Sequence, residues 1–215
     1  MVELGGFYLD IIKDRLYTTG AGSLPRRSAQ TAMYHIADAM VRWLAPILSF
    51  TAEEVWSFMP GVRNESVFLN VWHQFPAGAE RGSEVDWPAF IALKADVARQ
   101  LERLRTAGQI GAPLEAEVAI YAPAEQAQKF SALHDELRFL LITSQARVIE
   151  TDTPPIEAVP SHAENVWIEV KPSSQPKCVR CWHLRSDVGS DPRHPELCAR
   201  CVVNIDGPGE ERKFA

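Results

Sequence analysis

All four cysteines of the chain lie between residues 178 and 201. They form two Cys-x2-Cys pairs, Cys178 with Cys181 and Cys198 with Cys201, and sixteen residues separate the pairs. Two residues between thiols allow a tight turn to point both sulfurs at one place, and two such turns complete a tetrahedral shell. This spacing is typical of four-cysteine zinc sites. We therefore predict one Zn²⁺, and we expect it to be structural because a closed shell leaves no position for water.

Other uses of the cysteines explain the pattern less well. Two disulfides require an oxidising compartment, and no export signal in the sequence indicates one. A redox pair needs only one Cys-x2-Cys. Four thiolates also bind iron, and the sequence does not distinguish the two metals. His183 and His194 lie between the pairs and offer alternative ligands. We expect them to be surface residues, because four thiolates already complete the shell.

Composition limits the classes of function. The 215 residues carry a formal net charge of −6 and are 46% hydrophobic, which is ordinary for a globular chain. No overall positive field attracts a nucleic acid, so any RNA or DNA contact has to come from local patches. The N-terminal residues lack the basic start of a signal peptide, and the apolar run 43–50 is too short to span a bilayer. Together with reduced cysteines, this predicts a cytoplasmic location.

Periodicity predicts an α-rich α+β fold around the metal site. Helices are expected where apolar residues recur at three- and four-residue steps, and strands where apolar and polar residues alternate. The predicted helices cover residues 3–16, 26–44, 51–59, 86–107, 124–133 and 136–142. The predicted strands cover residues 115–121, 146–150 and 166–170, and the proline-rich segment 151–162 is expected to be loop.

Three capping signals mark helix ends. Thr51 and Glu54 have the spacing of a capping box, in which the threonine is the N-cap and the glutamate reaches back. Asp86 is the expected N-cap of the long helix, and Gly108 is the expected residue just past its C-terminal end.

The sequence contains no arrangement of residues that is typical of catalysis. It has no phosphate-binding Gly-x4-Gly-Lys-Ser/Thr loop, no Gly-x-Ser-x-Gly elbow and no helical His-x3-His pair. Glu53 and Glu54 are adjacent carboxylates, but adjacent residues on a helix do not face one point. We therefore expect no catalytic residue in this chain.

Three passages together resemble the C-terminal part of bacterial-type isoleucyl-tRNA synthetases. They are Gly6-Phe7-Tyr8-Leu9-Asp10-Ile11-Ile12-Lys13-Asp14-Arg15-Leu16-Tyr17, residues 43–56, and Cys178-Val179-Arg180-Cys181-Trp182-His183. The resemblance covers essentially the whole chain, although the metal-binding motif alone is shared with a family of DNA-repair glycosylases. It implies a partial helical anticodon-binding domain at 1–79, a small α/β junction domain at 80–171 and a zinc-finger module at 172–215.

The resemblance also implies a function. A member of this family joins isoleucine to its tRNA using ATP, but the HIGH-like and KMSKS-like strings of its catalytic domain are absent from this sequence. The expected molecule is therefore a fragment that binds isoleucine-specific tRNA together with the rest of the synthetase chain and is inactive alone. The first helices of the bundle have no counterpart either. Leu4, Phe7 and Ile11 are accordingly expected to form a dimer seam or an exposed apolar patch.

The resemblance implies that the helical bundle and the zinc module hold the anticodon end of the tRNA. Unpaired bases stack on aromatic side chains and guanidinium planes. Trp182 follows the second cysteine and is the first candidate, with packing over the metal cluster as the alternative. Arg180 and Arg200 lie inside the cysteine pairs, where they contact phosphate or balance the negative Zn–thiolate cluster. The further candidates are Arg185, Lys213, Phe214, Arg26 and Arg27.

Two other classes of function fit the same residues. One is a free-standing zinc-finger module that binds DNA or RNA in trans. The other is a structural domain without affinity for nucleic acid, which the acidic net charge favours.

Overall fold

The computed structural model describes residues 4–77 and 85–214. The chain divides into two units, one made of Met1–Arg26 with Ser83–Ala215 and the other of Arg27–Gly82. The three-domain division that the sequence suggests stays a prediction. Within the described ranges, none of the helices combines the length and the apolar character that crossing a bilayer requires.

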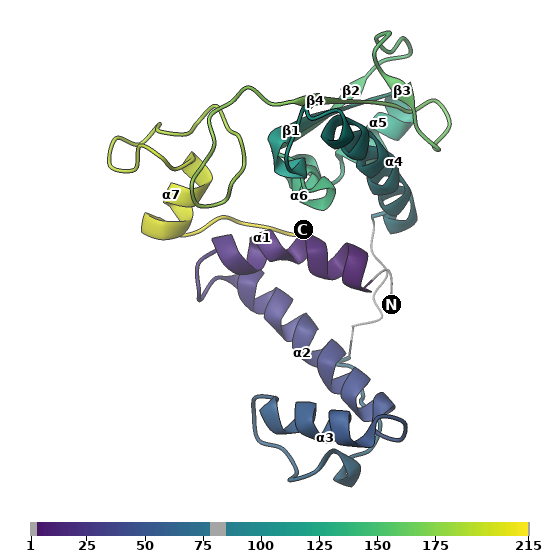
Figure 1. The fold of residues 1–215 in the computed structure, drawn as a ribbon, viewed down its shortest axis with the longest axis vertical. Helices are drawn as coiled ribbons and strands as arrows, with labels where there is room; N and C mark the ends of the chain where they lie inside the picture. Colours follow the sequence, from purple (N-terminus) through teal and green to yellow (C-terminus); the bar gives the residue numbers. More distant parts are fainter. Residues whose placement is uncertain (1–3, 78–84, 215) are drawn as a thin grey trace. The chain divides into compact units, whose positions relative to one another are not determined.

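A mixed four-stranded sheet forms the centre of the first unit (Figure 1). Its spatial order is β2-β1-β4-β3, with β1 parallel to β2 and antiparallel to β4, and β3 antiparallel to β4. The strands are β1 (Ala116–Ala122), β2 (Gln145–Glu150), β3 (Val159–Pro160) and β4 (Trp167–Pro172). A parallel pair needs a crossover connection. Here it contains α5 (Ala124–Ser131), the 3-10 turn η4 (His134–Glu136) and α6 (Leu137–Leu141).

The core of this unit lies between one face of the sheet and its helices. Along β1, Val118 and Ile120 are buried, while the alternating residues Glu117, Ala119 and Tyr121 are half-buried, as the two-residue period of a strand requires. The buried residues join apolar side chains of three helices in one cluster, which includes Phe90, Leu93, Val97, Phe130, Leu133, Leu137 and Leu140. The fold is therefore the α-rich α+β type that the periodicity predicts.

Helix α4 (Trp87–Thr106) has the two ends that the sequence predicts. The Asp86 side chain accepts a hydrogen bond from the Ala89 N–H at 3.1 Å, which satisfies one of the free donors of the first turn. Gly108 follows the last turn with a φ of +69°, and its N–H donates to the Arg105 carbonyl at 3.0 Å. Both capping predictions for this helix are confirmed.

The N-terminal helix is continuous but irregular. A π-helical segment, η1 (Leu4–Leu9), leads into α1 (Asp10–Thr18). Ile11 is only 6% exposed and belongs to the core of the first unit, and Phe7 packs against the same core. Ile11 therefore leaves no exposed apolar patch, and Phe7 is half-buried, while dimerisation stays a prediction.

The second unit has a separate, smaller core. It contains most of α2 (Leu24–Leu44), then α3 (Ser49–Phe58) and the 3-10 turn η2 (Val67–Leu69). Trp56 is buried, and its indole N–H donates to the Asn64 carbonyl at 3.0 Å. The buried cluster consists of Val41, Ala45, Ala52, Trp56, Met59 and Val67.

Two local predictions are wrong. Helix α3 begins at Ser49, so Thr51 lies within its first turn and is not an N-cap. The turn before the helix already supplies a backbone acceptor, since the Ala52 N–H donates to the Leu48 carbonyl at 2.8 Å. The segment predicted as loop contains the edge strand Val159–Pro160, where proline is tolerated because no further strand needs its missing N–H.

Candidate metal centre

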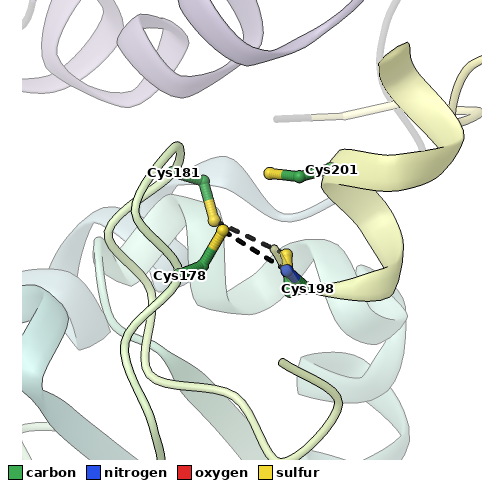
Figure 2. A group of neighbouring side chains, drawn as sticks. All are labelled: Cys178, Cys181, Cys198 and Cys201. Atoms are coloured by element: carbon green, nitrogen blue, oxygen red, sulfur yellow. Dashed lines mark hydrogen bonds between the residues drawn. The ribbon is translucent and has the colours of Figure 1, made fainter. Parts of the chain in front are cut away.

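The four cysteines converge on one point. Cys178 and Cys181 lie on a loop, Cys198 is the N-cap residue of α7 (Ala199–Asp206) and Cys201 lies in the first turn of that helix (Figure 2). All four are buried, and their sulfurs lie within 4.8 Å of one another. The Cys181 and Cys198 sulfurs are 3.7 Å apart. A tetrahedron with Zn–S bonds of about 2.3 Å has S–S edges of about 3.8 Å, so the spacing fits zinc.

Backbone hydrogen bonds hold the first cysteine pair in shape. The Trp182 N–H donates to the Cys178 carbonyl at 2.9 Å, and the Cys178 N–H donates to the His183 carbonyl at 2.9 Å. The Cys198 N–H points at the Cys178 sulfur, at 3.4 Å (Figure 2).

Among the described residues, the cluster of possible metal ligands consists of the four cysteines and includes neither of the two histidines between them. His183 was expected at the surface, but it is 2% exposed and packs edge-on against Phe139 with ring centroids 5.7 Å apart. Its Nε2 atom has no hydrogen-bond partner among the described residues. His194 Nε2 instead lies 2.7 Å from a carboxylate oxygen of Asp206.

Both arginines inside the cysteine pairs contact the end of α1. Arg180 Nη1 donates to the Thr18 carbonyl at 2.5 Å and lies 3.8 Å from the Cys201 sulfur. Arg200 forms a two-pronged ion pair with the Asp14 carboxylate, with N–O distances of 2.7 and 2.9 Å. The Arg200 side chain is only 10% exposed.

Asp14 pairs with arginines that are distant from it in the sequence. Arg212 also donates to its carboxylate, and Glu210 accepts from both Arg200 and Arg212 at 3.2 Å. The guanidinium groups of Arg200 and Arg212 lie over the Phe139 ring, 4.9 and 3.6 Å from its centroid. Burial raises the pKa of Asp14, but hydrogen bonding and charge from Arg200, with the charge of Arg212, lower it well below its usual range.

A cavity of about 450 Å³ adjoins the metal centre in the first unit. Its wall is mainly apolar and includes Tyr17 of α1, Phe139 and Ile142 at the end of α6, and Trp182 with His183. Trp182 is 61% exposed and has a φ of +65°, a left-handed conformation that is uncommon for a bulky residue. The metal-binding loop therefore presents one aromatic ring to solvent beside an apolar hollow.

The remaining candidates for tRNA contact lie in varied surroundings. Arg185 is half-buried, with its Nε 3.7 Å from an Asp187 oxygen. Lys213 is exposed, and its backbone N–H donates to Glu136 at 2.7 Å. Phe214 packs against the core of the first unit, while Arg26 is half-buried and Arg27 exposed on α2.

Sequence reasoning missed Asp14, Phe139 and Glu210. Their positions are separated from Arg200 by as many as 186 residues, and no local spacing links them. The one available signal is the run of charges Glu210-Glu211-Arg212-Lys213, which by itself indicates no more than a charged tail.

Comparison with known proteins gives two family matches. The model described as "Anticodon-binding domain of tRNA ligase" matches residues 1–120, and the model described as "Zinc finger found in FPG and IleRS" matches residues 175–203. With the sulfur geometry, the second match makes the four cysteines a structural zinc site.

Similar curated proteins carry the name isoleucine–tRNA ligase. The chain is 54% identical over 216 residues to the one from Pseudomonas putida (strain GB-1), 99% of this chain and 23% of that protein. It is 52% identical over 217 residues to the one from Nitrosococcus oceani, 100% of this chain and 23% of that protein. The chain thus spans 23% of the length of each of these relatives.

Proposed function

Because this chain belongs to the family of anticodon-binding domains of tRNA ligases, we propose that it is the part of an isoleucine–tRNA ligase that binds the anticodon region of isoleucine-specific tRNA. The whole ligase would join isoleucine to that tRNA using ATP. The proposal assigns binding of RNA to the residues of this chain and no catalytic step. Its partners are then the tRNA and the rest of the synthetase, in the cytoplasm.

The observation that carries the proposal is the exposed indole of Trp182. Its backbone is fixed on both sides, by the metal ligand Cys181 and by the buried His183. A rigid aromatic face in solvent suits an unpaired base, because stacking is worth roughly 1–3 kcal/mol per base and little side-chain entropy is lost. The apolar cavity beside Trp182 offers a second surface for the same base.

Phosphate contacts would supply much of the affinity. The net charge of −6 means that these contacts come from individual cations. Of the candidates, Arg27 and Lys213 are exposed, while Arg185 and Arg26 are half-buried. Each phosphate contact releases counterions, so the affinity should fall as the salt concentration rises.

The zinc would act only through structure. Bound by four thiolates, the metal supplies folding free energy to a module with a small apolar core of its own. The cysteines hold the metal, and the loop that they fix holds Trp182 in place.

Binding to altered tRNAs tests the proposal. The 215-residue chain should bind isoleucine tRNA more tightly than a transcript changed only at its anticodon bases, measured by fluorescence titration at low and moderate salt. Equal affinities for the two tRNAs would refute the proposal that this chain recognises the anticodon bases. Tighter binding to duplex DNA would support the alternative of a zinc-finger module acting on DNA, since the zinc-finger model is shared by two kinds of protein.

Dimerisation through the first helix is not part of this proposal. The apolar residues that suggested it, Phe7 and Ile11, pack on the chain's own core. Sedimentation that shows a stable dimer would require a different surface.

A further inference from the structure

The two cysteine pairs share a feature beyond their thiols. Each carries an arginine immediately before its second cysteine, Arg180 in one and Arg200 in the other. Both guanidinium groups point to the last turn of α1, where Arg180 donates to the Thr18 carbonyl and Arg200 donates to Asp14 and to the Thr18 hydroxyl. The carbonyls at a helix C-terminus lack partners within the helix and carry partial negative charge, so they are natural acceptors for arginine.

These contacts leave little of Arg200 for a ligand. Its side chain is 10% exposed, its two terminal nitrogens bond Asp14 and Glu210, and its plane lies over Phe139. Arg212, 1% exposed, is held by the same two carboxylates. Two arginines and two carboxylates thus neutralise one another in a buried cluster, as buried charges require.

We propose that Arg180 and Arg200 are positioning residues that fasten the zinc module to α1 through Thr18 and Asp14, and that they do not contact RNA. We call these four residues the arginine clasp. The zinc fixes the backbone on either side of each arginine, so metal binding determines where both guanidinium groups lie. Through the clasp, the metal orders the end of α1, including Tyr17, and sets that end against Trp182 across the cavity. The link to RNA rests on the proposed function, whereas the link between zinc and α1 does not.

Hydrogen exchange tests the clasp without RNA. In the wild-type chain, removal of zinc with a chelator should speed exchange of the amides at residues 14–19 about a hundredfold, the lower end of what loss of a buried ion pair implies. Arg200→Gln and Asp14→Asn should produce the same change while zinc remains bound. Arg193→Gln removes an exposed arginine from the same module and should leave these amides unchanged.

Binding of isoleucine tRNA separates a positioning role from an RNA contact. If Arg200 met RNA, Asp14→Asn would free it and tighten binding; the clasp predicts weaker binding instead, by about tenfold, a typical coupling between sites. Arg200→Gln should weaken binding while the slope of log affinity against log salt stays unchanged. Loss of a phosphate contact would reduce that slope by about 0.7 for single-stranded RNA. Asp14→Glu, which keeps the charge, should restore part of the affinity.

The outcomes are distinct. Unchanged exchange at residues 14–19 in Asp14→Asn with zinc bound overturns the clasp, and so does tighter tRNA binding by that variant. If Arg200→Gln itself loses zinc, the exchange result of Asp14→Asn is used instead, because this substitution leaves the sequence of the zinc module intact. Loss of zinc from Asp14→Asn also overturns the proposal. A wild-type chain that binds no tRNA refutes the proposed function, while the exchange result still decides the clasp.

Discussion

Trp182 occupies a conformation that costs free energy. A φ of +65° is unfavourable for a residue with a Cβ, yet the turn after Cys181 places the Trp182 N–H on the Cys178 carbonyl at 2.9 Å. Strained residues persist where the surroundings determine them, and they gather at functional sites. Here the metal ligands and the buried His183 provide those surroundings, and the exposed indole is the result.

Trp182→Ala tests the indole itself. We expect the affinity for isoleucine tRNA to fall about tenfold, the middle of the stacking range, with zinc content unchanged. Fluorescence titration and metal analysis measure the two quantities. Val179→Ala is the control, because Val179 is an exposed apolar residue of the same cysteine pair. If Trp182→Ala binds the tRNA with the affinity of the wild-type chain, Trp182 does not stack on a base.

Asp14 makes a prediction about pH. Its pKa is lowered in the folded chain, so the ionised form stabilises the fold at every pH above the unfolded value of about 3.9 and loses that effect only as the pH falls through the folded value. Asp14→Asn should therefore lower the free energy of unfolding of the first unit by about 3 kcal/mol. The deficit should be the same at pH 8, 6.5 and 5.

Urea unfolding of both variants at these three pH values provides the measurement. A deficit that shrinks between pH 8 and pH 5 would show that Asp14 is not the ionised partner over this range. Glu102→Gln is the control, since this carboxylate forms an exposed ion pair with Arg105 on α4.

At the scale of elements, signals that lie close together in sequence predict well. The caps of α4, Asp86 and Gly108, depend on contacts within five residues, and both are present. The cysteine spacing predicted the sulfur cluster for the same reason, because each pair forms its own turn. The capping box at Thr51 failed because the preceding turn already provides the backbone bonds that start α3.

Contacts between distant segments had no such signal. Three features depend on chain segments that only the fold brings together. They are the packing of Phe7 and Ile11 on the core, the pairing of β3 at the sheet edge, and the ion pair of Asp14 with Arg200. The periodic spacing of apolar residues indicates which face of a helix is buried, but it does not indicate which other segment packs against that face. This is why the metal site was predictable and its attachment to α1 was not.

Two glycines with positive φ allow strain and steric clash to be separated. Gly108 has a φ of +69°, and a Cβ added there would lie in open space. At Gly189, with a φ of +79°, an added Cβ would lie 2.8 Å from the Pro195 carbonyl oxygen. Gly108→Ala should cost about 1 kcal/mol from backbone strain. Gly189→Ala should cost about 1–3 kcal/mol more, because the metal-binding loop has to shift.

Thermal and urea unfolding of the two variants, with zinc content measured in parallel, test this difference. Equal losses of stability would show that the loop around Gly189 moves aside freely. In that case the loop between the cysteine pairs is looser than its hydrogen bonds suggest.

The molecule as a whole contains separate apolar clusters, one on the sheet, one around Trp56 and one around the metal. The metal cluster has few apolar members, so its stability should depend on zinc. The cluster around Trp56 belongs to residues 27–82 and shares no member with the other two. Loss of metal should therefore not propagate to it.

Cys198→Ser is the corresponding prediction. The variant should lose zinc and the order of the zinc module, while the sheet and residues 27–82 keep their protection from hydrogen exchange. Cys198→Ser with full zinc content would show that the ligands are wrongly assigned. Loss of protection around Trp56 would show that the second unit depends on the metal after all.

The ion pair between Asp14 and Arg200 joins residues 186 positions apart, and this has a consequence for synthesis on the ribosome. At about 5–20 residues per second, Asp14 is translated roughly 10–40 s before its partner. During that interval helix α1 has neither its counter-ion nor the metal-bound turns that fasten its end. A nascent chain therefore acquires the final conformation of α1 only after Arg200 has been translated, which exposes that helix to chaperones and proteases in every copy that is still shorter.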